Sequence, residues 1–151
     1  MKWILVLVGL PFLLAAGALW LNRAPLLDTP GPLQRIKLYL STHVAETRVD
    51  HERAELRPLL LDLPENKARD LVIQAMRRLC WQQIEARPEV LRAVVVTPLL
   101  RFRDDVEVRL IANSHGVLVH VRSGSRLGRG DFGANTRHIL DLYRQLEMPS
   151  G

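Results

Sequence analysis

Apolar residues recur every three or four positions in several stretches of the chain, which is the spacing of one face of an α-helix. The clearest stretch is residues 68–79. The segment before it is typical of a capping box, with Asp62 as the N-cap, Pro64 in the first turn and Glu65 at the third helical position. The apolar stripe that should face the core comprises Ala68, Leu71, Val72, Ala75, Met76 and Leu79.

Two further helices are predicted near the ends of the domain. Leu33, Ile36, Leu40 and Val44 favour a short amphipathic helix over residues 33–44. This helix either packs on the domain or lies on a bilayer surface. A final helix is expected over residues 132–148, with Asp131 as its N-cap and with a buried face that comprises Ile139, Tyr143 and Leu146.

Alternation of apolar and polar residues predicts strands in the part between these helices. Val106, Val108 and Leu110 share one face, and the residues between them are charged. Residues 113–116 and 103–105 have the composition of turns. The chain is therefore predicted to be α+β, with a four- to five-stranded, mainly antiparallel sheet flanked by helices. The predicted strands are 59–61, 81–86, 91–102 with a break at Pro98, 106–111 and 117–121.

The N-terminal run from Trp3 to Leu21 carries no charge and is just long enough to span a bilayer as a helix. Trp3 and Trp20 are spaced to lie at the two interfaces. The alternative is a cleaved signal peptide, with residues 16–18 as the small-residue cleavage site. Either way the remainder is exported, and we expect a single-pass bacterial inner-membrane protein with a periplasmic domain, or a protein secreted to the periplasm.

Three parts of the chain are distinguished on this basis. Residues 1–22 form the transmembrane anchor or signal, and residues 23–32, which contain three prolines, form a stiff tether. Residues 33–148 form a single α+β domain. This size is ordinary for one hydrophobic core.

A net charge of +5, from 18 arginines and 3 lysines against 16 acidic residues, raises nucleic acid as a partner. The basic residues are spread among the acids and no aromatic stacking platform is present, so the sequence argues against nucleic acid. The one cysteine, Cys80, excludes an internal disulfide and is interpreted as a small packing residue.

Several catalytic and metal-binding patterns are absent. The sequence His51–Glu55 lacks the second histidine of a zincin motif, and the five histidines show no ligand spacing; His138 falls on the last predicted helix. Ser123 and Ser125 lack a nucleophile elbow. The sequence therefore indicates neither a metal site nor a cofactor.

The stretch HVRSGSRLGRGDFGAN, residues 120–135, is the candidate site. A glycine- and serine-rich loop before a helix is typical of an anion site, and Arg122, Arg126 and Arg129 would add bidentate donors to phosphate or carboxylate. The alternative is structural: Asp104, Asp105 and Asp131 pair with Arg122 and Arg126 and pin the loop to its neighbouring hairpin.

Residues 39–146 resemble the bacterial and plastid family known as domain of unknown function 1499. The resemblance rests on an Asp-Asp hairpin, then Arg-Ser-x-Ser-Arg-x-Gly-x-x-Asp, then an asparagine four residues later. It implies no known activity, but it strengthens the set of candidate ligand-binding residues, which comprises Asp104, Asp105, Arg122, Ser123, Ser125, Arg126, Arg129, Asp131 and Asn135.

The predicted function is a membrane-tethered, periplasm-facing module that binds an anionic small molecule, a lipid headgroup or a partner protein, with no catalytic residue assigned. One alternative is a hydrolase in which Asp104 or Asp105 is the general base and Arg122 and Arg126 stabilise developing charge. Another is a structural scaffold that acts through residues 33–44.

Overall fold

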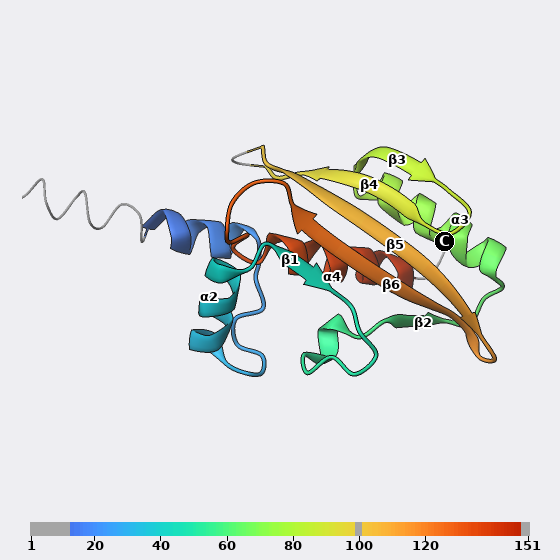
Figure 1. Cartoon of the computed structure of the whole chain (residues 1–151), viewed down its shortest axis with the longest axis horizontal. Helices are drawn as coiled ribbons and strands as arrows, with labels where there is room; N and C mark the ends of the chain where they lie inside the picture. The colour runs from blue at the N-terminus through green and yellow to red at the C-terminus, as the bar shows by residue number, and fades with distance from the viewer. Residues whose placement is uncertain (1–12, 99–100, 149–151) are drawn as a thin grey trace, which may run out of the picture.

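Two helices cover one face of a six-stranded antiparallel sheet in the computed structural model, which describes residues 13–98 and 101–148 (Figure 1). Residues 13–20 are helical and precede the domain. The elements that follow are α2 (Pro32–Ser41), β1 (Val44–Glu46), the 3₁₀ helix η1 (Ala54–Leu56), β2 (Leu59–Leu61), α3 (Glu65–Arg78), β3 (Gln82–Ala86), β4 (Leu91–Val96), β5 (Arg103–Asn113), β6 (Gly116–Ser125) and α4 (Ala134–Glu147).

Strand β6 pairs with three other strands, β1, β2 and β5. Along one edge, β6 pairs with β5 through ten residue pairs, from Asp104↔Ser125 to Asn113↔Gly116. The two strands are joined by the predicted turn at residues 113–116, which is confirmed. The other edge of β6 is shared by β1 and β2, and β4 and β3 continue the sheet beyond β5. The α+β class is confirmed, with one strand more than the four or five expected.

The predicted turn at residues 103–105 is wrong. Strand β4 ends at Val96, earlier than expected, and β5 already begins at Arg103. The amide of Phe102 donates to the hydroxyl of Thr97, at 2.9 Å, where the chain reverses. Consecutive aspartates are typical of turns, but here both lie within β5 and their side chains point to opposite faces of the sheet. Each has a partner on its own face, His138 for Asp104 and Arg126 for Asp105.

The predicted apolar stripe of α3 is confirmed as a core face. Ala68, Val72, Ala75 and Met76 are buried, while Leu71 and Leu79 are partly buried and pack against the core cluster. They meet inward residues of the sheet such as Val108 and Val119, and α4 covers the sheet beside α3 (Figure 1).

The ends of α3 differ from the prediction. Its N-cap is Pro64, and no side chain caps it, because the extended conformation of Pro64 starts the helix at Glu65 and leaves Asp62 outside the capping position. At the other end Cys80 has a φ of 57° and is exposed, so it is not the packing residue that we expected.

Helix α2 ends at Ser41, three residues before the predicted boundary. Thr42 donates from its amide and its hydroxyl to the carbonyl of Leu38, and Val44 lies in β1 opposite Gly124. Val44 continued the helical spacing by coincidence, and this strand was missed. Arg35 and Tyr39 are buried, so α2 packs on the domain, which was one of the two alternatives.

The buried guanidinium of Arg35 fastens the proline-rich segment to the domain. It donates to the carbonyls of Asp28 and Thr29 and to the hydroxyl of Tyr39, and it forms an ion pair with Glu55 at 2.7 Å. Burial lowers the pKa of Arg35, but the hydrogen bonds to Glu55 and Tyr39 outweigh it, so the pKa lies above its ordinary value. Residues 28–29 are thus part of the folded domain rather than of a free spacer.

About half of the predicted membrane segment, Trp3 to Leu21, falls within residues 1–12 and lies outside the described residues. Among residues 13–98 and 101–148, no helix is long and apolar enough to cross a bilayer.

Met76 tests the packing of α3 on the sheet, because its side chain is completely buried. Met76→Ala should lower the free energy of unfolding by about 2–5 kcal/mol, since the cavity left behind can only partly collapse. Arg78→Ala, on the exposed side of the same helix, should change it by less than about 0.5 kcal/mol. Urea denaturation of the full chain in mild detergent measures both. Equal small losses would mean that the stripe is not core.

Tyr143 of α4 makes stability depend on alkaline pH. Its hydroxyl donates to the carbonyl of Val119 at 2.7 Å, and burial raises its pKa to about 12. The folded state favours the protonated phenol. The resulting stability is therefore complete below pH 10 and is lost between pH 10 and pH 12, by about 2–3 kcal/mol. Denaturation at several pH values should show a smaller alkaline loss for Tyr143→Phe than for the wild type; identical slopes would contradict this.

Candidate functional site

The two adjacent aspartates of β5 lie on opposite faces of the sheet. Asp104 points toward the helices and is 1% exposed, whereas Asp105 points to the uncovered face. This follows from the alternation of side chains along a strand. The predicted site is therefore divided: Asp105, Arg122 and Arg126 lie outside, and Asp104, Ser123, Ser125 and Asn135 lie inside.

On the outer face, Arg126 forms a bidentate pair with Asp105. The N–O distances lie between 2.6 and 3.1 Å, and the hydrogen bond from Arg126 holds the pKa of Asp105 below its ordinary value. Both side chains are about half exposed, so the contribution of the pair to stability is small. This is the one predicted structural pair that the structure contains; Arg122 and Arg129 are exposed.

On the inner face, Asp104 pairs with His138 of α4. Oδ2 of Asp104 lies 2.9 Å from Nε2 of His138, and the imidazole packs edge-on against Trp81, with 6.5 Å between ring centroids. Oδ1 of Asp104 is buried and receives no hydrogen bond from the residues that the structure describes. A buried carboxylate oxygen without a donor is costly, and this atom therefore keeps an unused capacity to accept a hydrogen bond.

Asp131 occupies the start of α4 in place of an external anion. Its two carboxylate oxygens accept hydrogen bonds from the amides of Gly133 and Asn135, each at 2.9 Å. Burial raises the pKa of Asp131, against the lowering effect of these two amides, and the nearby charge of Asp104 raises it further. The prediction of Asp131 as the N-cap is wrong, because α4 begins at Ala134 and its N-cap is Gly133. Asp131 lies two residues before that cap and still binds amides at the start of the helix.

The glycines around Asp131 serve close packing. A Cβ on Gly130 would collide with the carbonyl group of Leu40, at the end of α2. Gly133 has a φ of 80°, in the left-handed region that glycine adopts readily, and a Cβ there would meet Ala24. The amide of Asp131 donates to carbonyls of Tyr39 and Thr42. The loop is thus shaped to lie against α2 and the N-terminal segment.

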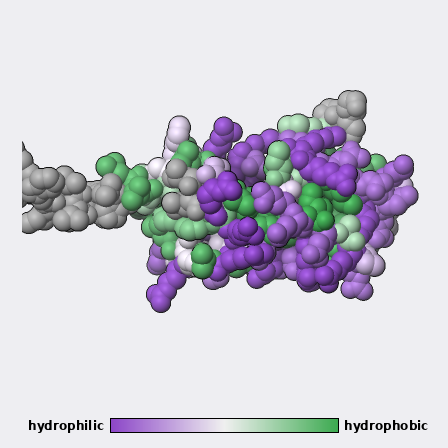
Figure 2. Space-filling model, turned by 90° about the horizontal axis from the view of Figure 1, so that it is seen from above, coloured by the Kyte–Doolittle hydropathy of each residue, from purple (hydrophilic) through white to green (hydrophobic). Residues whose placement is uncertain are grey.

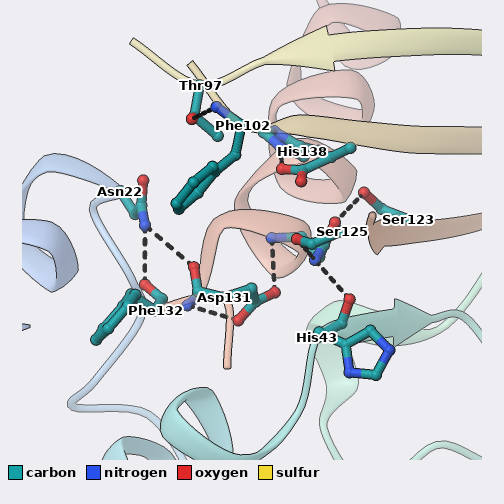
Figure 3. Close-up of polar contacts among 12 residues, drawn as sticks. Asn22, His43, Thr97, Phe102, Ser123, Ser125, Asp131, Phe132 and His138 are labelled. Atoms are coloured by element: carbon teal, nitrogen blue, oxygen red, sulfur yellow. Dashed lines mark hydrogen bonds and ion pairs between the residues drawn. The ribbon is translucent and has the colours of Figure 1, made fainter. Parts of the chain in front are cut away.

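Asn135 joins three segments through one buried side chain, and its partners Ser123, Ser125 and His43 are labelled in Figure 3. Its Oδ1 accepts from the hydroxyl of Ser123 at 2.6 Å. Its Nδ2 donates to the carbonyl of His43 and to the hydroxyl of Ser125, each at 2.9 Å. The serines of the motif are therefore held by Asn135 rather than arranged as nucleophiles.

A pocket of about 250 Å³ opens beside this network. Residues of the helical N-terminal segment, of the β4–β5 connection and of the loop before α4 form its walls. From the predicted site, only Asp104, Ser125 and Asp131 line it. The described lining residues are Ala18, Leu21, Asn22, Thr97, Pro98, Phe102, Asp104, Ser125, Leu127, Gly130, Asp131, Phe132 and Ala134.

Asn22, Phe102 and Phe132 shape the wall of the pocket. The amide group of Asn22 donates to the carbonyl of Phe132 at 3.0 Å, which ties the N-terminal segment to the loop (Figure 3). Phe102 and Phe132 supply aromatic surface. The sequence pattern assigned no role to Asn22, Phe102, Phe132 or His138, because these side chains meet only in the folded chain. Asn22 lies 75 residues before Thr97, the next residue along the chain that lines the pocket.

The hydrolase arrangement that the sequence suggested is divided by the sheet if Asp104 is the base, whereas Asp105 lies with Arg122 and Arg126 on the outer face. Arg126 binds Asp105 on the outer face, while Asp104 lies on the inner face with His138. A general base and its stabilising arginine would need to share one substrate. Within residues 13–98 and 101–148, no group of three histidine, cysteine or acidic side chains is placed to hold a metal ion.

Asn135 should be the most sensitive position of the motif. Asn135→Ala leaves the carbonyl of His43 and the hydroxyl of Ser123 buried without their partner, and each should cost about 1–3 kcal/mol of unfolding free energy. Arg126→Ala removes only an exposed pair and should cost less than about 1 kcal/mol. Thermal and urea denaturation of the full chain compare the two variants; a larger loss for Arg126→Ala would reverse the assignment of inner and outer roles.

Comparison with known proteins places the chain in a family. A family model described as "Protein of unknown function (DUF1499)" matches residues 34–146, which covers the sheet, α2, α3 and most of α4. No curated protein and no solved structure matches the chain. The match includes the Asp-Asp strand and the loop before α4, in agreement with the resemblance of these motifs, and the chain therefore belongs to the DUF1499 family.

Proposed function

We propose that this domain is a binding module, held at a membrane by its N-terminal apolar segment, whose pocket takes an amphiphile with a hydroxyl or amine group. The observation that carries the proposal is the carboxylate of Asp104. It is buried among the lining residues of the pocket, and its Oδ1 receives no hydrogen bond from the described part of the chain.

The size and the walls of the pocket favour an apolar ligand body. Its volume of about 250 Å³ exceeds the ~150 Å³ of an engineered cavity that binds benzene and falls somewhat below that of drug-sized sites. Leu21, Phe102, Leu127 and Phe132 are the large apolar side chains among its described lining residues. A ligand of this kind gains from leaving water roughly in proportion to the apolar area that it buries.

The polar groups of the pocket select a donor over an anion. Asp104 and Asp131 are both acceptors, and none of the described lining residues is an arginine or lysine. An anion would meet the field of two carboxylates, whereas a hydroxyl or amine can donate to Oδ1 of Asp104. The anionic ligand expected from the sequence fits better outside the pocket, where the exposed arginines lie.

The membrane tether is part of the proposal and rests on the uncharged run between Lys2 and Arg23. The end of this run, at Ala18 and Leu21, contributes to the pocket wall. A tether in the membrane would therefore hold the pocket close to the amphiphiles of the bilayer. In the pocket, a binding role is preferred to an enzymatic one because none of its described lining residues is an arginine that could stabilise developing charge beside Asp104.

The test uses a long-chain alcohol that carries a photoreactive diazirine, with the full chain in lipid nanodiscs. Illumination should attach the probe to the loop at residues 127–132. Asp104→Asn should lower this labelling about tenfold or more at limiting probe, because a hydrogen bond to a charged group contributes about 1.5–3 kcal/mol. Asp105→Asn is the matched control, since its carboxyl lies on the other face of the sheet, and it should label like the wild type. Peptide mass spectrometry reads the position.

Two further measurements control for unfolding of the variant and for labelling outside the pocket. A thermal melt shows whether Asp104→Asn is folded, and Ala18→Trp narrows the pocket from the N-terminal side without touching Asp104. Ala18→Trp should also lower labelling of the loop. Equal labelling of all variants, or labelling of the wild type at unrelated positions only, would refute the pocket as the binding site.

A further inference from the structure

Large apolar side chains are exposed around the mouth of the pocket. Leu21, Phe102 and Leu127 line the pocket and yet are 53%, 40% and 68% exposed, and Trp20 next to them is 78% exposed. Figure 2 shows hydrophobic residues gathered at the end of the molecule where the helical residues 13–20 meet the domain. Because the same side chains line the pocket and reach solvent, the pocket opens within this apolar surface.

Arginines flank each of these apolar residues in the chain. Arg23 follows Leu21 by two positions, Arg101 and Arg103 are adjacent to Phe102, and Arg129 follows Leu127 by two positions. All four arginines are exposed. We call the surface formed by Trp20, Leu21, Phe102 and Leu127 with Arg23, Arg101, Arg103 and Arg129 the apolar–arginine rim.

The carboxylates nearest to the rim do not neutralise it. Asp104 is buried against His138, the carboxylate of Asp131 is taken up by amides of α4, and Asp105 is paired with Arg126. The rim therefore combines exposed apolar surface with a cationic border. Apolar residues that insert at the headgroup boundary and basic residues that attract anionic lipid are the two parts of an interfacial membrane contact.

The chain itself indicates the occupant of this surface. The rim begins at Trp20 and Leu21, which end the uncharged run of the N-terminus, and Asn22 fastens that end to the loop before α4 through its hydrogen bond to Phe132. Where this run enters a bilayer, the rim is the part of the domain next to the lipid surface. No flexible spacer intervenes, because Arg35 holds residues 28–29 against the domain.

From these observations we infer that the apolar–arginine rim seats the domain directly on an anionic lipid surface, with the mouth of the pocket facing the bilayer. The seat is a second membrane contact in addition to the N-terminal segment. It gives an amphiphile a route from the bilayer into the pocket that does not cross water. The seat rests on the membrane tether of the proposed function, and it does not depend on what the pocket contains.

The experiment places a fluorescent label on the rim of the full chain in proteoliposomes. Cys80→Ser removes the single native thiol, and Leu127→Cys introduces the labelling site. Leu60→Cys is the matched control, since Leu60 is a 46% exposed leucine on β2, at the opposite end of the sheet from the N-terminal helix (Figure 1). The vesicles contain phosphatidylglycerol and phosphatidylcholine brominated on the acyl chains, which quench fluorescence from within the bilayer.

The label at position 127 should be quenched about threefold more than the label at position 60, since only the rim would reach the acyl chains. Arg101→Gln combined with Arg129→Gln should reduce the difference, because each basic residue near an anionic surface strengthens the contact about fivefold. Vesicles of brominated phosphatidylcholine alone should have the same effect. Equal quenching at the two positions would overturn the seat. Equal photolabelling of the wild type and Asp104→Asn would instead refute the pocket as the ligand site and would leave the seat intact.

Discussion

The side chain of Asn135 is the contact on which the arrangement of the domain most depends. One carboxamide accepts from Ser123 and donates to Ser125 and to the carbonyl of His43, so it fixes α4 to β6 and to the chain that leads into β1. Each partner is buried or partly buried, and each would lose its hydrogen bond if α4 were displaced. A short, fully satisfied polar network of this kind sets position more sharply than apolar packing, which tolerates sliding.

The network also determines what the neighbouring loop can do. With Asn135 in place, Asp131 lies where its carboxylate takes the first amides of α4, and the glycines beside it pack against α2 and the N-terminal segment. The features that resemble an anion-binding loop in the sequence are thereby used within the fold. What remains available is the space between the loop, Phe102 and the N-terminal segment, with Asp104 at its wall.

The division of the site by the sheet explains how one motif serves two surfaces. Asp104 and Asp105 differ by one position and therefore by one face, so the first joins the buried side with His138 and the second joins the exposed side with Arg126. The inner side carries the proposed ligand and the outer side adds only weak ion pairs. In the described part of the chain, the arginines of the apolar–arginine rim form no ion pair with these aspartates. In our proposal they face a lipid surface rather than the pocket.

Much of the fold was predictable from local pattern. The stripe from Ala68 to Leu79, the alternation from Val106 to Leu110 and the turn at residues 113–116 each follow from periodicities of 3.6 and 2, which act within a few residues. Local patterns gave wrong predictions where one pattern is compatible with two structures. Val44 fits the helical spacing but lies in strand β1. Asp62 has the spacing of a capping box, but the N-cap of α3 is Pro64.

The composition of the site was determined by the sequence, but its geometry was decided by the tertiary structure. The motif identified Asp104, Ser125, Asp131 and Asn135, whereas the partners of these residues come from segments far away in the chain: His138 for Asp104, His43 for Asn135, and Asn22 for the loop. Hydrogen bonds and pockets depend on distance in space. Periodicity indicates which face a residue occupies, but not which distant side chain will lie opposite it, since that is fixed only when the helices pack on the sheet.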